Sequence, residues 1–350
     1  MRILGRDDVR AALNGLETTV LDAVRTAYLL HGRGQSQVPF STFLRPPETP
    51  GSRIISLPAH LGGPAPVMGL KWISSFPANV EQGLQRASSL QILNDLETGY
   101  PSALLEGSQI SASRTAASAA LAAGALHGDR TVRTVGLIGC GTINHRVAAY
   151  LTLTHPAVET MVLQDAVPGR AEALAAELAG AHPGITFRAG DIAEALGAQT
   201  VSVATTDSSY WLELADFPGR PDGQVILHLS LRDLSTSSVL GAYNVVDDVE
   251  HTVREQTSLH RAEQEVGHRA FVRAEIAAFL DGSATPPHAG TTVFSPFGLG
   301  ILDLAVADAV LAAAARAGIG SEVAGFDPGS HRVTGAAGRT EAPAVAGRAA

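Results

Sequence analysis

The sequence has little of several features that would point directly to a function. Its 350 residues include one cysteine, Cys140, so no disulfide can form within the chain, and we expect a reducing, cytoplasmic compartment. No Lys/Arg cluster offsets the formal net charge of −9, which argues against a nucleic-acid partner. The 12 histidines show no paired ligand spacing such as H-x-H, so we expect no metal site.

Membrane signals are also missing from the sequence. Asp7 and Asp8 stand where a signal peptide would need an apolar run. The alanine-rich runs near 115–126 and 304–315 are too short and too weakly apolar to span a bilayer. With 45% hydrophobic and 17% charged residues, the composition is that of a globular protein long enough for two domains. We therefore expect no membrane partner.

The most informative stretch is residues 131–151, TVRTVGLIGCGTINHRVAAYL. A short apolar run predicts a buried strand, and a G-C-G turn at 139–141 and an apolar-periodic helix follow it. Glycines allow the backbone to approach a pyrophosphate, and the helix N-terminus offers free N–H groups and a positive dipole end. Strand, turn and helix in this order are typical of a dinucleotide-binding unit.

The G-x-G-x-x-G motif is incomplete here, because Asn144 replaces its third glycine. After the helix, a second apolar run ends at Asp165, about where an acidic residue binds the ribose hydroxyls of the cofactor. An acid there without a neighbouring arginine favours NAD over NADP. The alternative is a tight strand–helix turn without a ligand. We favour the cofactor site because all the elements occur in the required order.

The N-terminal part of the chain predicts an antiparallel α+β domain. Residues 6–32 predict two helices, and 38–108 predict a series of short strands with a hairpin at 97–101, E-T-G-Y-P. Residues 109–126 predict a helix of small side chains, which suits close packing between domains.

The middle of the chain predicts a Rossmann domain, so the fold class is α/β. Strands alternate with helical segments, which indicates a doubly wound parallel sheet, and we read 249–281 as helical and polar. We expect three parts: an α+β domain at 1–126 with a return helix at 300–318, an NAD-binding Rossmann domain at 127–299, and a disordered tail at 320–350.

Four polar residues stand where the pattern alone would not place them. Lys71 interrupts an apolar strand, so it is either a functional buried ammonium or a lysine that snorkels at a strand edge. Arg114 lies among hydroxyl residues at a helix start, which suits either a carboxylate receptor or a surface ion pair. Arg86 alone would be read as solvated. Asp233 follows a predicted strand, where α/β sheets bind ligands, or caps the next turn.

With these residues in view, the chain resembles the ornithine cyclodeaminase/mu-crystallin family up to about residue 318. The segments that carry the resemblance are GLKWISSFPANVEQGLQRAS, NDLETGYPSALLEGSQISASRTAA and GCGTIN. Together with FSPFGLGILDLAVAD, they are most similar to the branch of 2,3-diaminopropionate biosynthesis dehydrogenases of siderophore and peptide-antibiotic pathways. The resemblance implies a homodimer formed through the N-terminal domain, with substrate between that domain and an NAD-binding Rossmann domain. It thus implies that the first part, 1–126 with the return helix, is the substrate-binding and dimerisation domain.

The resemblance also implies roles for individual residues. Lys71 and Arg114 match positions that hold the substrate α-carboxylate. Cyclodeaminases carry a glutamate in the strand that reads IISLP here, where we place Ser56 as a substrate contact, and an aspartate that Asp233 matches only approximately. Both differences count against ornithine as substrate. The implied cofactor contacts are Gly139, Gly141, Thr142, Ile143, Asn144, Asp165, Thr205 and Thr206.

The reaction implied by this branch is NAD-dependent oxidative N-dealkylation of N-(2-amino-2-carboxyethyl)-L-glutamate to L-2,3-diaminopropionate and 2-oxoglutarate. We predict that Arg86 receives the carboxylate that ornithine lacks, and that either Lys71 or Asp233 is the catalytic proton acceptor. The alternatives are ornithine cyclodeamination, alanine dehydrogenation or ketimine reduction within the family, or non-catalytic NAD(H) binding.

Overall fold

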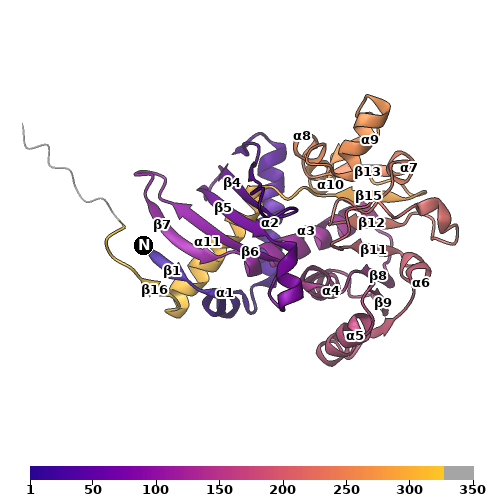
Figure 1. Cartoon of the computed structure of the whole chain (residues 1–350), viewed down its shortest axis with the longest axis horizontal. Coiled ribbons are helices and arrows are strands. Elements are labelled where there is room, and N and C mark those ends of the chain that lie inside the picture. Colours follow the sequence, from indigo (N-terminus) through magenta and orange to yellow (C-terminus); the bar gives the residue numbers. More distant parts are fainter. Residues whose placement is uncertain (327–350) are drawn as a thin grey trace, which may run out of the picture.

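The computed structural model describes residues 1–326, which form two lobes, each built around an eight-stranded sheet (Figure 1). The first lobe contains the chain's beginning and the last described helix. Its elements are β1 (Arg2–Leu4), α1 (Arg6–Leu13), α2 (Glu17–Gly32), β2 (Ser36–Gln37), β3 (Thr42–Leu44), β4 (Arg53–Leu61), β5 (Val67–Ser75), a 3₁₀ turn (Pro77–Gln82), β6 (Ala87–Asn94), β7 (Pro101–Glu106), α3 (Ser108–His127), α11 (Gly300–Ala317) and β16 (Ser321–Glu322).

The first sheet has the order β16-β1-β7-β6-β5-β4-β2, with β3 also paired to β4. Neighbouring strands in this sheet are antiparallel, except that β1 runs parallel to β7. The sequence did not predict β1, because three residues are too few to show an alternating pattern. The prediction of a disordered tail from residue 320 is wrong for β16, because this strand pairs with β1. Residues 327–350 of the predicted tail lie outside the described residues.

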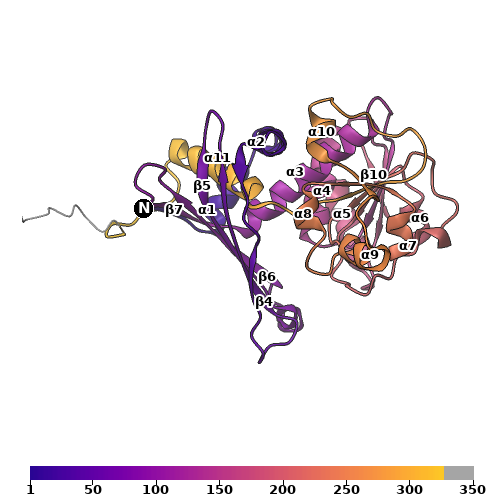
Figure 2. The same ribbon diagram turned by 90° about the horizontal axis from the view of Figure 1, so that it is seen from above.

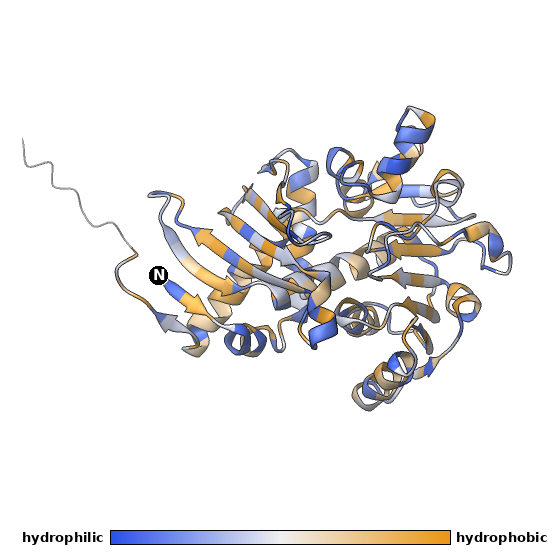
Figure 3. Ribbon diagram, in the orientation of Figure 1, coloured by the Kyte–Doolittle hydropathy of each residue, from blue (hydrophilic) through white to orange (hydrophobic). Residues whose placement is uncertain are grey.

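Helices cover only one face of this sheet. In Figure 2, α1, α2 and α11 lie on the same side of the strands, and α11 contacts β4, β5 and β6. The side chains of Leu57, Ala59 and Leu61 alternate along β4 and are buried. On the opposite face, Trp72 and Leu90 are 42% and 43% exposed. The hydropathy colouring in Figure 3 shows the apolar stretches along the strands of both lobes.

The second sheet is entirely parallel, in the order β10-β9-β8-β11-β12-β15-β13-β14, which confirms the predicted doubly wound architecture. Its elements are β8 (Thr134–Ile138), α4 (Thr142–Thr154), β9 (Thr160–Gln164), α5 (Arg170–Ala181), β10 (Thr186–Ala189), α6 (Ile192–Leu196), β11 (Thr200–Val203), a 3₁₀ turn (Leu214–Asp216), β12 (Val225–His228), α7 (Thr236–Leu240), β13 (Tyr243–Val246), α8 (Val249–Thr252), α9 (Ser258–Val266), β14 (Val272–Glu275), α10 (Ile276–Leu280) and β15 (Thr292–Ser295).

The prediction that 249–281 is helical throughout is wrong in one segment. Strand β14 interrupts the helices and pairs with β13 at the edge of the parallel sheet. Its sequence V-R-A-E places charged residues at alternate positions, which an edge strand tolerates but which resembles a polar helix locally. No helix of residues 1–326 is both long and apolar enough to cross a membrane.

Helix α3 connects the two lobes. It packs against α2 in the first lobe and against α4 in the second. Its buried side chains are mostly alanine and serine, so neighbouring helices approach closely. The predicted small-residue helix at 109–126 therefore lies at the junction of the lobes, and the residues around its start form the candidate site.

Candidate functional site

A buried carboxylate binds two cations at the junction of the lobes. The Lys71 Nζ atom on β5 donates to Asp303 Oδ2 at 3.0 Å and to Ser111 Oγ at 3.1 Å. The Nε atom of Arg114 lies 3.2 Å from the same Asp303 oxygen. The side chains of Lys71 and Asp303 are 4% and 0% exposed, so their charges are compensated mainly by each other rather than by water. Lys71 is therefore a buried ion-pair member and not a snorkelling edge residue.

The protonation of Lys71 is poised near neutral pH. Burial lowers the pKa of Lys71 to about 8, the nearby Arg114 charge acts in the same direction, and Asp303 opposes both. Lys71 is also the only lysine among the 25 Lys and Arg residues of the chain. A lysine with this pKa can exchange a proton at neutral pH, whereas an arginine cannot. The residue therefore has the properties of an acid–base group.

A tight glycine turn supports Arg114. Gly298 has a φ of +92°, which favours glycine, and a Cβ atom there would lie 2.7 Å from an Arg114 guanidinium nitrogen. Asp247 holds this turn by accepting from the backbone N–H groups of Phe297 and Gly298 at 2.8 and 2.7 Å. The sequence reasoning missed Asp247 and Asp303. Asp303 could have been found, because it interrupts an apolar helix as Lys71 interrupts an apolar strand.

Buried polar atoms without partners lie on the same face of the first sheet. The register places Gln91 opposite Lys71 and Ser89 opposite Ile73. Within the described chain, neither amide atom of Gln91 nor the Ser89 hydroxyl has a hydrogen-bond partner, and Gln91 is 0% exposed. Native proteins rarely bury such atoms unsatisfied. These atoms therefore indicate a surface built to receive a polar ligand next to Lys71.

The register contradicts the prediction that Ser56 contacts the substrate. Ser56 lies opposite Trp72, whereas Lys71 lies opposite Leu57. Because alternate side chains of a strand point to opposite faces, Ser56 is on the other side of the sheet from Lys71. The β4 side chains on the Lys71 face next to this point are Ile55 and Leu57, neither of which can bind an amine. Strand β4 contains no acidic residue at all.

Arg86 reaches the Lys71 face of the sheet. It precedes β6, and its Nη1 atom donates to Ser75 Oγ at 3.4 Å. Burial and the neighbouring Arg53 charge lower the pKa of Arg86. Arg86 is thus a partly desolvated cation, unlike the solvated side chain that the local sequence suggested.

The glycine turn of the second lobe has the geometry of a dinucleotide site. Gly139 has a φ of +89°, and a Cβ atom there would lie 2.4 Å from the Ala204 carbonyl oxygen. The Cys140 N–H donates to Asp165 Oδ2 at 2.7 Å, which brings the turn and the end of β9 together. Burial raises the pKa of the Cys140 thiol to about 12, so this thiol stays protonated. Gly141 has open space beside it, which leaves room for a phosphate group.

Helix α4 begins at this turn with free N–H groups. Gly141 is its N-cap and supplies no side-chain cap, so the first turn at Thr142 and Ile143 is available to an anion. Asn144 is 0% exposed, donates to the carbonyls of Ile138 and Gly139, and accepts from Ser202. The Asn144 side chain therefore holds the turn itself.

Asp233 anchors the loop that follows β11. It is 0% exposed, accepts from the Thr205 and Ser230 hydroxyls, and lies 3.3 Å from His228 Nε2. Burial would raise the pKa of Asp233, but the His228 interaction and the hydroxyl donors outweigh it and hold the pKa below its usual value. Ser235, rather than Asp233, caps α7, so the capping alternative is wrong. Asp233 thus positions Thr205, beside the exposed Thr206.

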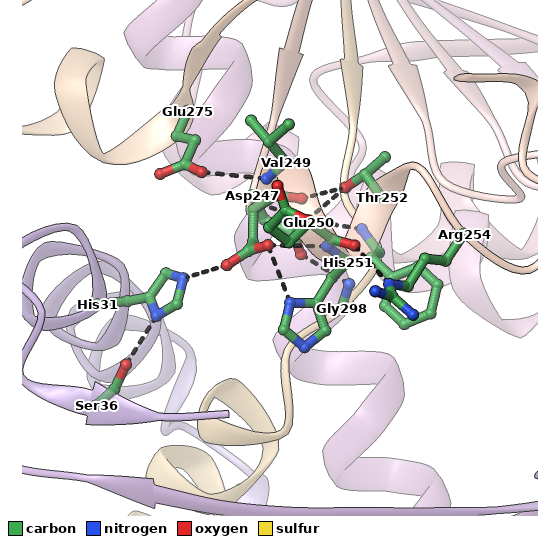
Figure 4. Close-up of polar contacts among 12 residues, drawn as sticks. His31, Ser36, Asp247, Val249, Glu250, His251, Thr252, Arg254, Glu275 and Gly298 are labelled. Carbon is green, nitrogen blue, oxygen red and sulfur yellow. Dashed lines mark hydrogen bonds and ion pairs between the residues drawn. The ribbon is translucent and has the colours of Figure 1, made fainter. Parts of the chain in front are cut away.

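A second carboxylate group joins the lobes close to Asp247. His31 from α2 contacts Ser36 Oγ at 2.7 Å and Asp248 Oδ2 at 3.0 Å, and His251 Nδ1 contacts Asp248 Oδ1 at 2.9 Å. Figure 4 shows His31 and Ser36 approaching the 247–251 segment from the first lobe. Among residues 1–326, no group of three His, Cys, Asp or Glu side chains is arranged to hold a metal ion.

These elements define a dinucleotide-binding dehydrogenase of the Rossmann class. The acid at Asp165 lies at the end of β9, and no arginine adjoins it in sequence, so the residues present fit NAD. The model of the ornithine cyclodeaminase/mu-crystallin family matches residues 3–214, and the chain belongs to this family.

One relative and two solved structures are similar to this chain. The N-((2S)-2-amino-2-carboxyethyl)-L-glutamate dehydrogenase of Staphylococcus aureus is 27% identical over 92% of this chain and 97% of its own. The structure of Thermococcus litoralis Delta(1)-pyrroline-2-carboxylate reductase with NADH and L-proline is 25% identical, with a TM-score of 0.84 over 92% of this chain and all of that one. An archaeal alanine dehydrogenase dimer with NAD shares the fold, at 24% identity and a TM-score of 0.81 over 92% and 98% of the two chains.

Proposed function

We propose that the protein is an NAD-dependent dehydrogenase that oxidatively N-dealkylates N-(2-amino-2-carboxyethyl)-L-glutamate, giving L-2,3-diaminopropionate and 2-oxoglutarate. The observation that carries this proposal is Arg86, a partly buried cation on the same sheet face as Lys71. Lys71 and Arg114, whose charges Asp303 already shares, can hold at most one α-carboxylate, so a further cation suits a substrate with additional carboxylates. The similarity to the Staphylococcus aureus enzyme supports the same substrate.

The reaction can be written with its protons and electrons balanced. The glutamyl Cα–H bond breaks as a hydride transfer, the bridging nitrogen loses its proton, and a Cα=N imine forms. NAD⁺, when bound, is the acceptor of the hydride and its two electrons. Water then adds to the imine carbon, and the C–N bond breaks to leave the ketone of 2-oxoglutarate and the β-amine of diaminopropionate.

Lys71 is the proposed proton acceptor in this scheme. With the pKa lowered to about 8, an appreciable fraction of the Lys71 Nζ atoms is unprotonated at neutral pH and can take the proton of the bridging nitrogen. Asp233 is already engaged by two hydroxyl groups and by His228, and its lowered pKa makes it a weak base. We therefore assign Asp233 to positioning the Thr205 loop rather than to proton transfer.

The decisive experiment incubates the protein with the conjugate and NAD⁺. We expect one NADH per 2-oxoglutarate formed, measured by absorbance and by mass spectrometry, and loss of the activity in Lys71→Met. Ornithine, alanine and proline are the comparison substrates. Turnover of ornithine to proline without net NADH, or oxidation of alanine alone, would replace the proposal with another activity of the family. Cofactor binding without turnover of any substrate would favour a binding protein.

We also propose that the protein is a homodimer joined through the uncovered face of the first sheet. Trp72 and Leu90 lie opposite each other on that face, and each is more than 40% exposed. Exposed aromatic and aliphatic side chains at the centre of a sheet are typical of an interface. The archaeal alanine dehydrogenase is described as a dimer, which supports this arrangement. Light scattering should give twice the chain mass, and Trp72→Glu should reduce it to the chain mass.

A further inference from the structure

Three arginines from both lobes converge beside the candidate site. Arg53 begins β4 directly opposite Ser75, and Arg86 donates to the same Ser75. Arg232 follows β12 in the second lobe, and its Nη2 atom donates to the Glu255 carbonyl at 2.6 Å. Glu255 in turn forms an ion pair across the junction with Arg45 at 2.5 Å. These contacts place the three guanidinium groups around the point where the lobes meet.

The positive charge of this arginine cluster, Arg53, Arg86 and Arg232, is only partly offset by the protein. Within residues 1–326, none of the three has a carboxylate at ion-pair distance, and the nearby Glu255 carboxylate is taken by Arg45. The buried Nε atom of Arg53 has no hydrogen-bond partner in that part of the chain. Burial lowers the pKa of each arginine, and each also lowers the pKa of another, while Glu255 acts against the shift in Arg53 and Arg232.

The backbone around Arg232 is strained. In the described part of the chain, four residues other than glycine have positive φ angles, and all of them belong to the segments that contact Arg232 or precede it. Tyr210 donates from its backbone N–H to the Arg232 carbonyl and from its hydroxyl to Gln256. Strain of this kind persists where a structure holds groups for a function. The φ values are 58° at Tyr210, 68° at Leu231, 53° at Glu255 and 56° at Gln256.

We propose that Arg53, Arg86 and Arg232 form a second carboxylate subsite, which binds the carboxylates of the substrate that Lys71 and Arg114 do not hold. Guanidinium groups bind carboxylates through paired hydrogen bonds, and a partly desolvated cluster of them favours binding of an anion. This inference rests on the proposed function, in which the substrate carries three carboxylates. It adds Arg53 and Arg232 as residues that select an acidic substituent over an apolar one.

The position of Arg232 gives this subsite a second consequence. Arg53 and Arg86 belong to the first lobe, whereas Arg232 belongs to the loop that Asp233 anchors next to Thr205. A dicarboxylate bound by all three therefore links the first sheet to the cofactor-binding lobe. Binding of an acidic substituent then holds the reacting carbon against the cofactor lobe, which a monocarboxylate cannot do.

The test compares two keto acids that differ in one carboxylate. The affinities of 2-oxoglutarate and 2-oxopentanoate are measured by calorimetry in the presence of NADH. We expect the wild-type protein to prefer 2-oxoglutarate, and Arg53→Gln and Arg232→Gln each to reduce this preference at least tenfold while binding 2-oxopentanoate within twofold of wild type. Arg273→Gln on the exposed edge strand β14 is the matched control and should change neither affinity.

Several results would overturn the subsite. These are equal wild-type affinities for the two acids, an unchanged preference in both variants, or an equal loss for both acids, which would indicate a merely structural role. Unchanged NADH affinity in Arg53→Gln verifies that the variant is folded, and Arg53→Lys should keep part of the preference. A different result would contradict the proposed function alone. In that case the conjugate is not turned over, although the wild-type protein prefers 2-oxoglutarate and the arginine variants lose this preference.

Discussion

Two groups of cations lie at the junction of the lobes, and they differ in how their charge is compensated. Lys71 and Arg114 share the buried carboxylate of Asp303, so their geometry is set before any ligand arrives. The arginine cluster has no such carboxylate among the described residues. A compensated pair contributes to the fold and tunes a pKa, whereas an uncompensated cluster costs stability until an anion binds. This difference can be tested by changing one group at a time.

Asp303→Asn should have the largest effect on the compensated pair. The substitution leaves two buried cations without a counter-charge, and breaking such a pair costs about 3–5 kcal/mol. Because Asp303 raises the pKa of Lys71, its removal should also lower that pKa further below 8. Chemical denaturation measures the free energy of unfolding, and the pH profile of the reaction measures the shift in pKa.

Asp308→Asn is the matched control for this substitution. Asp308 lies on the same helix, α11, but it is exposed and forms no ion pair within the described part of the chain. Its replacement should change the free energy of unfolding by less than about 0.5 kcal/mol. An equal loss in both variants would show that the stability of α11, and not the buried pair, is what Asp303→Asn disturbs.

Lys71 provides the next prediction, because its function requires a neutral amine. The reaction rate should rise with pH and level off above about 8, as the Lys71 ammonium loses its proton. Lys71→Arg keeps the charge but cannot release a proton at this pH, so we expect kcat to fall by about 10²–10⁴-fold. Since Lys71 is the only lysine, ¹³C-lysine labelling gives one resonance that reports its pKa directly. A pKa near 10 would contradict the assignment.

The sequence predicted local features well and long-range ones poorly. The sequence correctly assigned the Gly139 turn and Asp165 to one structural unit, because strand, glycine turn and helix form one continuous segment. Lys71 was recognised because a charge inside an apolar strand is visible in a single segment. Ser56 was misplaced, because the face of a strand depends on a register that neighbouring strands determine.

The partners of the candidate residues could not be read from the sequence. Asp303 lies 232 residues from Lys71 in the chain, and no local pattern relates the two. Arg53 and Arg232 come from different lobes, so their proximity follows only from the packing of the lobes. Composition gave the number of cations, but only the tertiary structure shows which of them lack a counter-charge.

The His31–Asp248–His251 contact extends the comparison to a second compensated group. The hydrogen bond and the charge of Asp248 raise the pKa of His251 above 6.5 despite burial, and the two histidines hold the pKa of Asp248 below 3.8. The contribution of this group to stability is therefore complete between about pH 4 and 6.5. It is lost as pH rises through the raised pKa of His251, or falls through the lowered pKa of Asp248.

His251→Gln separates this contact from other pH effects. Glutamine can donate a hydrogen bond to Asp248 but does not titrate, so the loss of stability above pH 6.5 should become smaller in the variant. Below pH 6.5 the variant should be less stable by about 1 kcal/mol, since the ionised Asp248 then accepts from a neutral amide instead of a charged imidazolium. Thermal unfolding between pH 5 and 9 measures both effects. Parallel pH curves for the two proteins would show that His251 does not contribute.

The smallest expected effect concerns the arginine cluster without ligand. Arg53→Gln removes one of three charges that repel each other, so the ligand-free variant should be more stable than wild type by up to about 1 kcal/mol. The gain should shrink in high salt, which screens the repulsion. Adding 2-oxoglutarate with NADH should reverse the order, because a ligand stabilises the protein that binds it more tightly. A variant that is less stable than wild type without ligand would mean that Arg53 is compensated by the protein, which would remove the contrast between the two groups of cations.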